Sequence, residues 1–243
     1  MTRRRWIADR VLGDRAWLTG TNAAHLAKVL RAKEGQQFDI AAEGLLREGT
    51  IVSITPEQVE FELGAAVEST PLPEISVLLS IFKFDRLEWA VEKLTELGVS
   101  RIIPVVSRRT EPHLARAAEK RVERWHKIAH EAAQQARRLQ PPEVSSPLPL
   151  KKALPQTSGC RIVLSEVEET ASVKLAVAQC QPPVTLAFGP EGGWASEELD
   201  FFRETGWKAA SLGGTILRTE TAVIAAVAIA ISELAEGFAA DQR

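Results

Sequence analysis

Cysteine is scarce in this chain of 243 residues. Cys160 and Cys180 are its two cysteines, they lie twenty residues apart, and no CxxC pair is present. Zinc sites and disulfide frameworks in small proteins need several cysteines at short, regular spacings. The scarcity therefore argues against a zinc or disulfide scaffold, and it predicts two reduced thiols that serve as buried side chains.

Long apolar runs are also absent. The longest, at 222–231, has about half the ~20 residues that cross a bilayer, and no apolar stretch follows the N-terminal MTRRRWIADR. We therefore expect neither export nor membrane insertion, and a cytoplasmic location. Because 45% of the residues are hydrophobic, the chain can bury a full core, as one large domain or as one large and one small domain.

A general excess of positive charge is missing too, since the formal net charge is −2. This balance excludes a protein that is basic overall and binds nucleic acid with its whole surface. Residues 101–140 nevertheless carry ten Lys/Arg against four Glu, a local charge of +6. A basic segment on an acidic body can present one face to a polyanion, and a solvated helix face with ordinary charges is the equally weighted alternative.

The first part of the chain changes from a helical to a strand pattern. Residues 22–33 have apolar side chains at helical spacing, between a cap at Thr21 or Asn22 and a stop at Gly35. Short alternating segments over 38–63, separated by AEG, REG and TPEQ, predict a β-meander. We expect a small β-rich domain over residues 1–70, followed by a linker at STPLPE.

After Glu74, strand and helix patterns take turns. Strands are expected at 75–82, 101–107, 161–166, 184–189 and 209–213, and helices at 86–97, 115–139, 170–180, 196–205 and 219–238. Such alternation is typical of an α/β domain, here 74–243, in which helices cover both faces of a mostly parallel sheet. Ligands of such sheets bind at the carboxyl ends of the strands.

Two glycine loops follow strands of this predicted sheet, FGPEGGWASEE at 188–198 and SLGGTILRTETA at 211–222. Glycines between a strand and a helix often bind phosphate. Glu191 would repel a phosphate, however, and neither the Walker spacing nor GxGxxG is present. The sequence therefore indicates a ligand other than phosphate.

Together these loops resemble the knotted SPOUT class of RNA methyltransferases, and most closely the bacterial 16S rRNA uridine-N3 methyltransferase (ribosomal small subunit methyltransferase E) family. The resemblance covers nearly the whole chain through HLAKVLRAKEGQQF (25–38), KFDRLEWAVEKLTELGVSRIIPVVSRRT (83–110) and EAAQQARRLQPPEV (131–144). In the last segment the family usually has a small residue and a glycine before its arginine. This chain has Ala136 and Arg137 there, so Arg138 is the matching arginine.

The resemblance implies a PUA-like β-barrel that binds RNA over 1–70 and a methyltransferase domain with a trefoil knot over 74–243. It also implies a homodimer, S-adenosylmethionine as methyl donor, and 16S rRNA of the small ribosomal subunit as substrate, without a metal or a membrane. The uncharged adenosine and cationic sulfonium of that donor suit glycines beside a carboxylate better than a phosphate would.

The residues expected at the cofactor lie at strand ends and in the two loops. They are Leu164, Phe188, Gly189, Pro190, Gly192, Gly193, Leu212, Gly213, Ile216, Leu217 and Thr221. The glycines would let the main chain approach the adenine, and Leu212, Ile216 and Leu217 would supply apolar walls.

Methylation of a uracil nitrogen requires removal of its proton and stabilisation of charge on the ring. Arg218 is the first candidate, because a guanidinium can hold a uracil carbonyl oxygen. Glu191 and Glu220 are candidates for the proton acceptor or for orienting Arg218. For each carboxylate, a capping or ion-pair role is an equal alternative.

The candidates for RNA contact are mostly arginines: Arg3, Arg4, Arg5, Arg31, Arg108, Arg109, Gln135, Arg137 and Arg138. Trp6, within RRRW, is the tryptophan best placed to stack on a base. His126 and His130 are one helical turn apart but lack a third ligand, so no metal site is expected. A ribose 2′-oxygen methyltransferase and a non-catalytic rRNA-binding protein remain the alternative functions.

Overall fold

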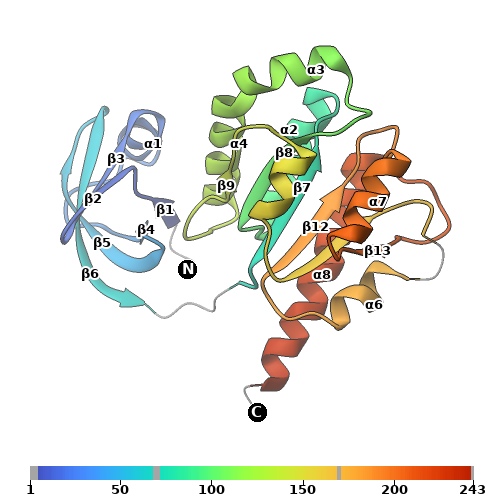
Figure 1. The fold of residues 1–243 in the computed structure, drawn as a ribbon. Helices are drawn as coiled ribbons and strands as arrows, with labels where there is room; N and C mark the ends of the chain where they lie inside the picture. The colour runs from blue at the N-terminus through green and yellow to red at the C-terminus, as the bar shows by residue number, and fades with distance from the viewer. Residues whose placement is uncertain (1–4, 68–71, 169–170, 242–243) are drawn as a thin grey trace. The chain divides into compact units, whose positions relative to one another are not determined.

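The computed structural model describes residues 5–67, 72–168 and 171–241. The chain divides into two compact units, drawn as ribbons in Figure 1. Residues 1–71 and 133–141 make up the first unit, and residues 72–132 and 142–243 make up the second. The first unit therefore includes a segment that is distant from the N-terminus in sequence.

The first unit is built on a curled six-stranded sheet (Figure 1). In spatial order its strands are β1 (Arg5–Ile7), β4 (Gln37–Ala42), β5 (Leu45–Ile54), β6 (Gln58–Val67), β3 (Arg15–Thr19) and β2 (Arg10–Leu12). β1 runs parallel to β4, and the other neighbours are antiparallel. Leu18, Ile40 and Phe61 are fully buried in its core. The β-meander predicted over 38–63 is confirmed as β4, β5 and β6.

The N-terminal strands and the first helix differ from the predictions. The helix expected over 22–33 is α1 (Gly20–Ala24), which continues as a π-helical turn, η1 (His25–Val29). β1, β2 and β3 were not predicted, because three to five residues are too few for an alternating pattern to be distinctive. Trp6 is 7% exposed and packs in the core of this sheet, so the expectation that it stacks on RNA bases was wrong.

The second unit is built on a seven-stranded sheet in which every pairing is parallel. Its order is β10 (Leu148–Pro149), β8 (Arg101–Val106), β7 (Ile75–Ser80), β12 (Val184–Phe188), β11 (Cys160–Leu164) and β13 (Lys208–Ala210), with β9 (Glu143–Val144) also on β8. The short β9 and β10 were not predicted. The five strands that were predicted from their apolar runs all form.

Successive residues of a strand point to opposite faces, so the buried strands feed two cores. Val77 and Leu79 of β7 pack in one core, and Leu78 packs in the other. The first core is closed by α2 (Phe84–Leu97), α4 (Val122–Gln135), α6 (Val173–Ala178) and α8 (Thr219–Asp241), and the second by α5 (Leu150–Ala153), η3 (Leu154–Gln156) and α7 (Ser196–Glu204). The expected α/β domain with both faces covered is confirmed.

The helices predicted over 115–139 and 219–238 form with different bounds, the second as α8 (Thr219–Asp241). The helix expected over 115–139 is divided into α3 (Pro112–Ala117), a 3-10 turn η2 (Ala118–Arg121) and α4. One side of the apolar run in α8 faces the core, since Val223, Val227 and Ala230 are fully buried, whereas Ala228 is exposed. Within the described ranges, no helix has the length and apolar character needed to cross a bilayer.

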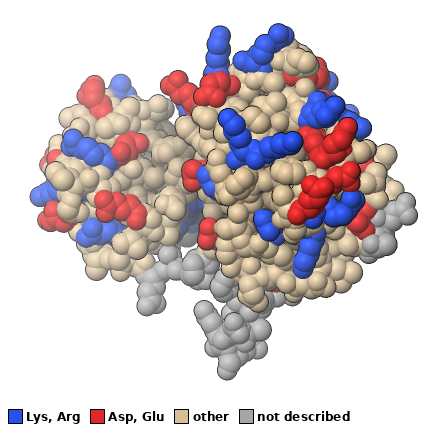
Figure 2. All heavy atoms as spheres, viewed as in Figure 1, with Lys and Arg blue, Asp and Glu red and all other residues tan. Residues whose placement is uncertain are grey.

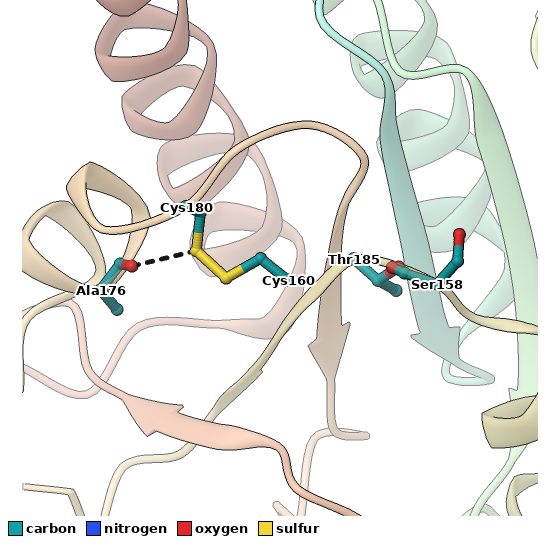
Figure 3. The surroundings of a disulfide bond; sticks show 5 residues. All are labelled: Ser158, Cys160, Ala176, Cys180 and Thr185. Atoms are coloured by element: carbon teal, nitrogen blue, oxygen red, sulfur yellow. Dashed lines mark hydrogen bonds between the residues drawn. A yellow bond between two sulfur atoms is a disulfide. The ribbon is translucent and has the colours of Figure 1, made fainter.

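Cys160 and Cys180 are joined as a disulfide, with their Cα atoms 5.7 Å apart (Figure 3). The expectation of two reduced thiols was therefore wrong. Cys160 begins β11 and Cys180 follows the end of α6. Because the connection after β11 returns along the sheet through α6, it brings together two residues whose sequence spacing did not suggest a pair.

Phe202 offers a test of the second core. Its ring is fully buried between Trp194 and Trp207, with ring centroids 4.8 and 5.0 Å away. Phe202→Ala should lower the free energy of unfolding by about 3–5 kcal/mol, because it removes a large apolar side chain and leaves a cavity. Urea denaturation measures this change. In Leu175→Ala, a control on α6 where Leu175 is 60% exposed, the change should stay within about 0.5 kcal/mol.

Candidate functional site

A cavity of about 740 Å³ lies at the carboxyl ends of three neighbouring strands of the parallel sheet. One segment, 164–168, begins at the last residue of β11, a second, 188–191 with 193 and 194, begins at the last residue of β12, and a third, 211–219, follows β13. These three segments, with Arg86, Leu199 and Ala222, line the cavity. The fold thus brings the two glycine loops of the sequence into one concave surface.

Most residues that we expected at the cofactor lie in this lining. They are Leu164, Phe188, Gly189, Pro190, Gly193, Leu212, Gly213, Ile216 and Leu217. Of the described residues, Gly192 and Thr221 were also expected there but do not line the cavity. Ile216 is 87% exposed and therefore lies at the open rim.

The strand end after β11 was not recognised as part of the site beyond Leu164. Ser165, Glu166, Val167 and Glu168 all line the cavity. Because β11 pairs with both β12 and β13, its carboxyl end had to fall between the two glycine loops. The order of strands, which a single sequence does not show, was the missing signal.

Residues 190–193 form a tight turn at the centre of the lining, which we call the glycine turn. The backbone N–H of Gly193 donates to the carbonyl oxygen of Pro190 at 2.8 Å. Gly193 has φ +68°, and a Cβ on it would lie 2.9 Å from Oε1 of Glu166. A side chain at Gly193 would therefore be strained by the positive φ, and the end of the Glu166 side chain would have to move away from it.

Trp194 holds the end of the glycine turn against the sheet. Its buried indole N–H donates to the carbonyl oxygen of Leu164 at 3.0 Å. The indole ring also packs against Phe202 of α7. Glu198 also fixes the segment after the glycine turn. Its carboxylate accepts hydrogen bonds from the backbone N–H of Ala195 at 2.9 Å and from that of Arg108 at 2.8 Å.

The two candidate carboxylates lie on either side of Arg86, at the start of α2. Nη1 of Arg86 is 2.7 Å from Oε1 of Glu191, and its Nε is 3.6 Å from Oε1 of Glu220. Glu191 lines the cavity, whereas Glu220 is 6% exposed and does not. Arg218, the candidate for holding the uracil oxygen, is exposed and lines the cavity.

The arginines expected to contact RNA are in different surroundings. Nη1 of Arg109 donates to the carbonyl oxygen of Gly192 at 2.6 Å, so this side chain lies on the glycine turn. Arg108 is exposed beside it. Figure 2 shows Lys and Arg side chains at the α3 end of the second unit, with acidic side chains among them. Glu88 of α2 pairs with Arg121 of η2 and with Arg124 of α4, at 3.4 and 2.7 Å.

The remaining RNA candidates belong to the first unit. Arg5 donates a hydrogen bond to the carbonyl oxygen of Arg137, which is exposed and has φ +56°. Burial lowers the pKa of the Arg138 guanidinium to about 10, so it stays a cation at neutral pH. Gln135 and Arg31 are exposed. Arg3 and Arg4 lie outside the described residues.

A metal ligand set is not found among the described residues, where no three His, Cys, Asp or Glu side chains cluster suitably. His126 instead forms a hydrogen bond to the main chain, in which its Nε2 is 2.6 Å from the carbonyl oxygen of Val144.

Two family models match the chain. Residues 68–231 match the RNA methyltransferase domain, and residues 18–64 match the RNA methyltransferase PUA domain. Among solved structures, a methyltransferase from Legionella pneumophila with the bound cofactor SAM is 26% identical, with a TM-score of 0.81 over 96% of this chain and 98% of that one. A ribosomal RNA small subunit methyltransferase E from Neisseria gonorrhoeae, bound to S-adenosyl methionine, is 26% identical, with a TM-score of 0.78 over 94% of this chain and 96% of that one.

Curated relatives carry the same name as the Neisseria protein. The ribosomal RNA small subunit methyltransferase E of Bacillus subtilis is 31% identical over 237 residues, which cover 93% of this chain and 92% of the relative. That of Mycobacterium tuberculosis is 32% identical over 230 residues, covering 89% and 85%. The chain belongs to the ribosomal RNA small subunit methyltransferase E family.

Proposed function

We propose that this protein transfers a methyl group from S-adenosylmethionine to N3 of a uridine in 16S rRNA of the small ribosomal subunit. The observation that carries the proposal is the cavity at which the two glycine loops of an RNA methyltransferase domain meet. Mass spectrometry of nucleosides from 16S rRNA treated with the protein tests it, and the expected product is 3-methyluridine.

The cavity fits S-adenosylmethionine in space and in charge. A Cβ built on Gly213 or Gly214 would have no atom within 4 Å, so the second loop leaves open room beside its main chain. Glu166, Glu168 and Glu191 line the cavity, and carboxylates favour a ligand that carries a sulfonium and an ammonium group. When bound, this cofactor supplies a methyl group activated by the positive sulfur.

Arg218 is proposed to bind the uracil, because its guanidinium lies at the cavity and can hold a carbonyl oxygen on which negative charge develops. Between the two carboxylates, Glu191 reaches the cavity and Glu220 does not. We therefore assign acceptance of the N3 proton to Glu191. Arg86 orients that carboxylate through the 2.7 Å contact. Buried Glu220 in turn orients Arg86 through the 3.6 Å contact.

The assembly proposed around this site follows the family resemblance. Residues 1–70 would bind RNA as a PUA-like barrel, and residues 74–243 would carry the methyltransferase site on a trefoil knot. A homodimer would let one subunit's barrel hold RNA at the partner's cavity. The protein would act in the cytoplasm, where ribosomal subunits are assembled.

Two alternative functions can be distinguished from this one by experiment. A ribose 2′-oxygen methyltransferase would use similar cofactor loops, and its product would be a 2′-O-methylated nucleoside in the same mass spectra. A non-catalytic rRNA-binding protein would leave the RNA unmodified and would not bind S-adenosylhomocysteine in a calorimeter.

Gly214→Val should abolish or strongly weaken binding of S-adenosylhomocysteine, because its side chain would enter the space beside the second glycine loop. Calorimetry measures the binding. The fold should persist, since a Cβ on Gly214 meets no atom and its φ is not positive. Gly64→Val, at an exposed position of β6, should bind normally. Normal binding by the Gly214 variant would place the cofactor elsewhere.

Arg218→Ala should lower the single-turnover rate of methylation at saturating RNA and cofactor by about a hundredfold, the effect typical of removing an oxyanion-type donor. Rapid quench with labelled cofactor measures that rate. Binding of RNA and of S-adenosylhomocysteine should change much less. A near-normal rate would reduce Arg218 to a structural residue of its loop.

A further inference from the structure

We propose that Arg109 is a positioning residue that holds the glycine turn in its cofactor-binding shape, and that it does not contact RNA. This inference rests on the proposed function, because it takes the cavity to be the cofactor site. It also replaces the expectation, drawn from the basic segment of the sequence, that Arg109 belongs to an RNA-binding face.

The side chain of Arg109 lies along two consecutive glycines. Its Nη1 donates to the carbonyl oxygen of Gly192 at 2.6 Å. A Cβ built on Gly192 would lie 3.6 Å from Cδ of Arg109, and a Cβ built on Gly193 would lie 3.9 Å from its Nη1. Both distances are those of ordinary van der Waals contact, so the arginine side chain lies directly along the two glycines.

The glycine turn needs such support because the backbone hydrogen bond from Gly193 to Pro190 does little by itself to fix its shape. Glycine has more backbone freedom to lose than any other residue, so a turn with two glycines is costly to keep in one shape. A hydrogen bond from a charged donor is stronger than one between neutral groups and offsets part of that cost.

Arg86, at the start of α2, contacts the same turn. It pairs with Glu191, the residue before Gly192, at 2.7 Å. Arg86 follows β7 and Arg109 follows β8, and β7 lies between β8 and β12 in the sheet. Glu191 and Gly192, two successive residues of the turn, thus each contact a guanidinium group. The two arginines come from the segments that follow the neighbouring strands β7 and β8.

The arrangement also explains why an arginine is needed. The planar guanidinium can extend over the glycines and still aim an N–H at the carbonyl oxygen. A lysine would keep the charge but would present a compact ammonium on a flexible stem. Arg109→Lys therefore separates the two roles, since a phosphate contact depends mainly on charge and the glycine turn depends on geometry.

The test compares Arg109→Lys and Arg109→Ala with Arg116→Ala, a control that removes an exposed arginine of α3. Calorimetry gives the affinity for S-adenosylhomocysteine, and hydrogen exchange gives the protection of the Gly193 amide. Binding of a 16S rRNA fragment is measured over a range of salt concentrations. Arg137→Ala serves as the comparator expected to contact phosphate.

Both Arg109 variants should bind S-adenosylhomocysteine more weakly, by about tenfold for the alanine variant and less for lysine. Exchange of the Gly193 amide without ligand should accelerate in the same order. Their RNA affinity and salt slope should match those of the wild type, whereas Arg137→Ala should lower the salt slope by about 1. Arg116→Ala should leave ligand affinity and exchange unchanged.

The proposal is overturned if Arg109→Ala binds S-adenosylhomocysteine normally with normal exchange, or if its salt slope falls as in Arg137→Ala. Failure of the proposed function would look different: either the wild-type protein itself would not bind S-adenosylhomocysteine, or the nucleoside mass spectra would lack 3-methyluridine. The exchange of the Gly193 amide would still report in that case whether Arg109 holds the turn.

Discussion

The hydrogen bond from the Trp194 indole to the Leu164 carbonyl oxygen joins two of the three segments that make the cavity. Leu164 ends β11, and Trp194 closes the glycine turn after β12. The bond is buried, so water cannot compete for it, and the ring that donates it is packed against Phe202. The position of the glycine turn therefore depends on an aromatic core on one side of the sheet.

The arginines at and beside the cavity differ in their contacts. Arg86 lies between Glu191 and Glu220, and Arg109 donates to a main-chain oxygen. Arg218 is exposed at the cavity. Two of the arginines thus contact the protein itself, whereas the third is exposed at the cavity, where we propose that it binds the uracil.

The sequence predicted the sheet of the second unit well, because its strands are buried on both faces and read as continuous apolar runs. The residues after β12 and β13 were recognised for the same reason, since they interrupt those runs with glycine. Glu166, Arg86 and the disulfide partners were missed, because their roles depend on which strands are neighbours. Arg109 was assigned to RNA since its charge is visible in the sequence and its acceptor, a backbone carbonyl, is not.

The first unit contains a final constraint in the segment 133–141. Ala133, at the end of α4, is fully buried against Ile7 and Ala41 of the curled sheet, with Leu139 packed beside them. The N-terminal unit thus has a second apolar cluster, apart from its main core, that includes residues from the middle of the chain. Neither unit is one uninterrupted stretch of the chain, so a cut of the chain at 69–74 would separate the curled sheet from residues that pack against it.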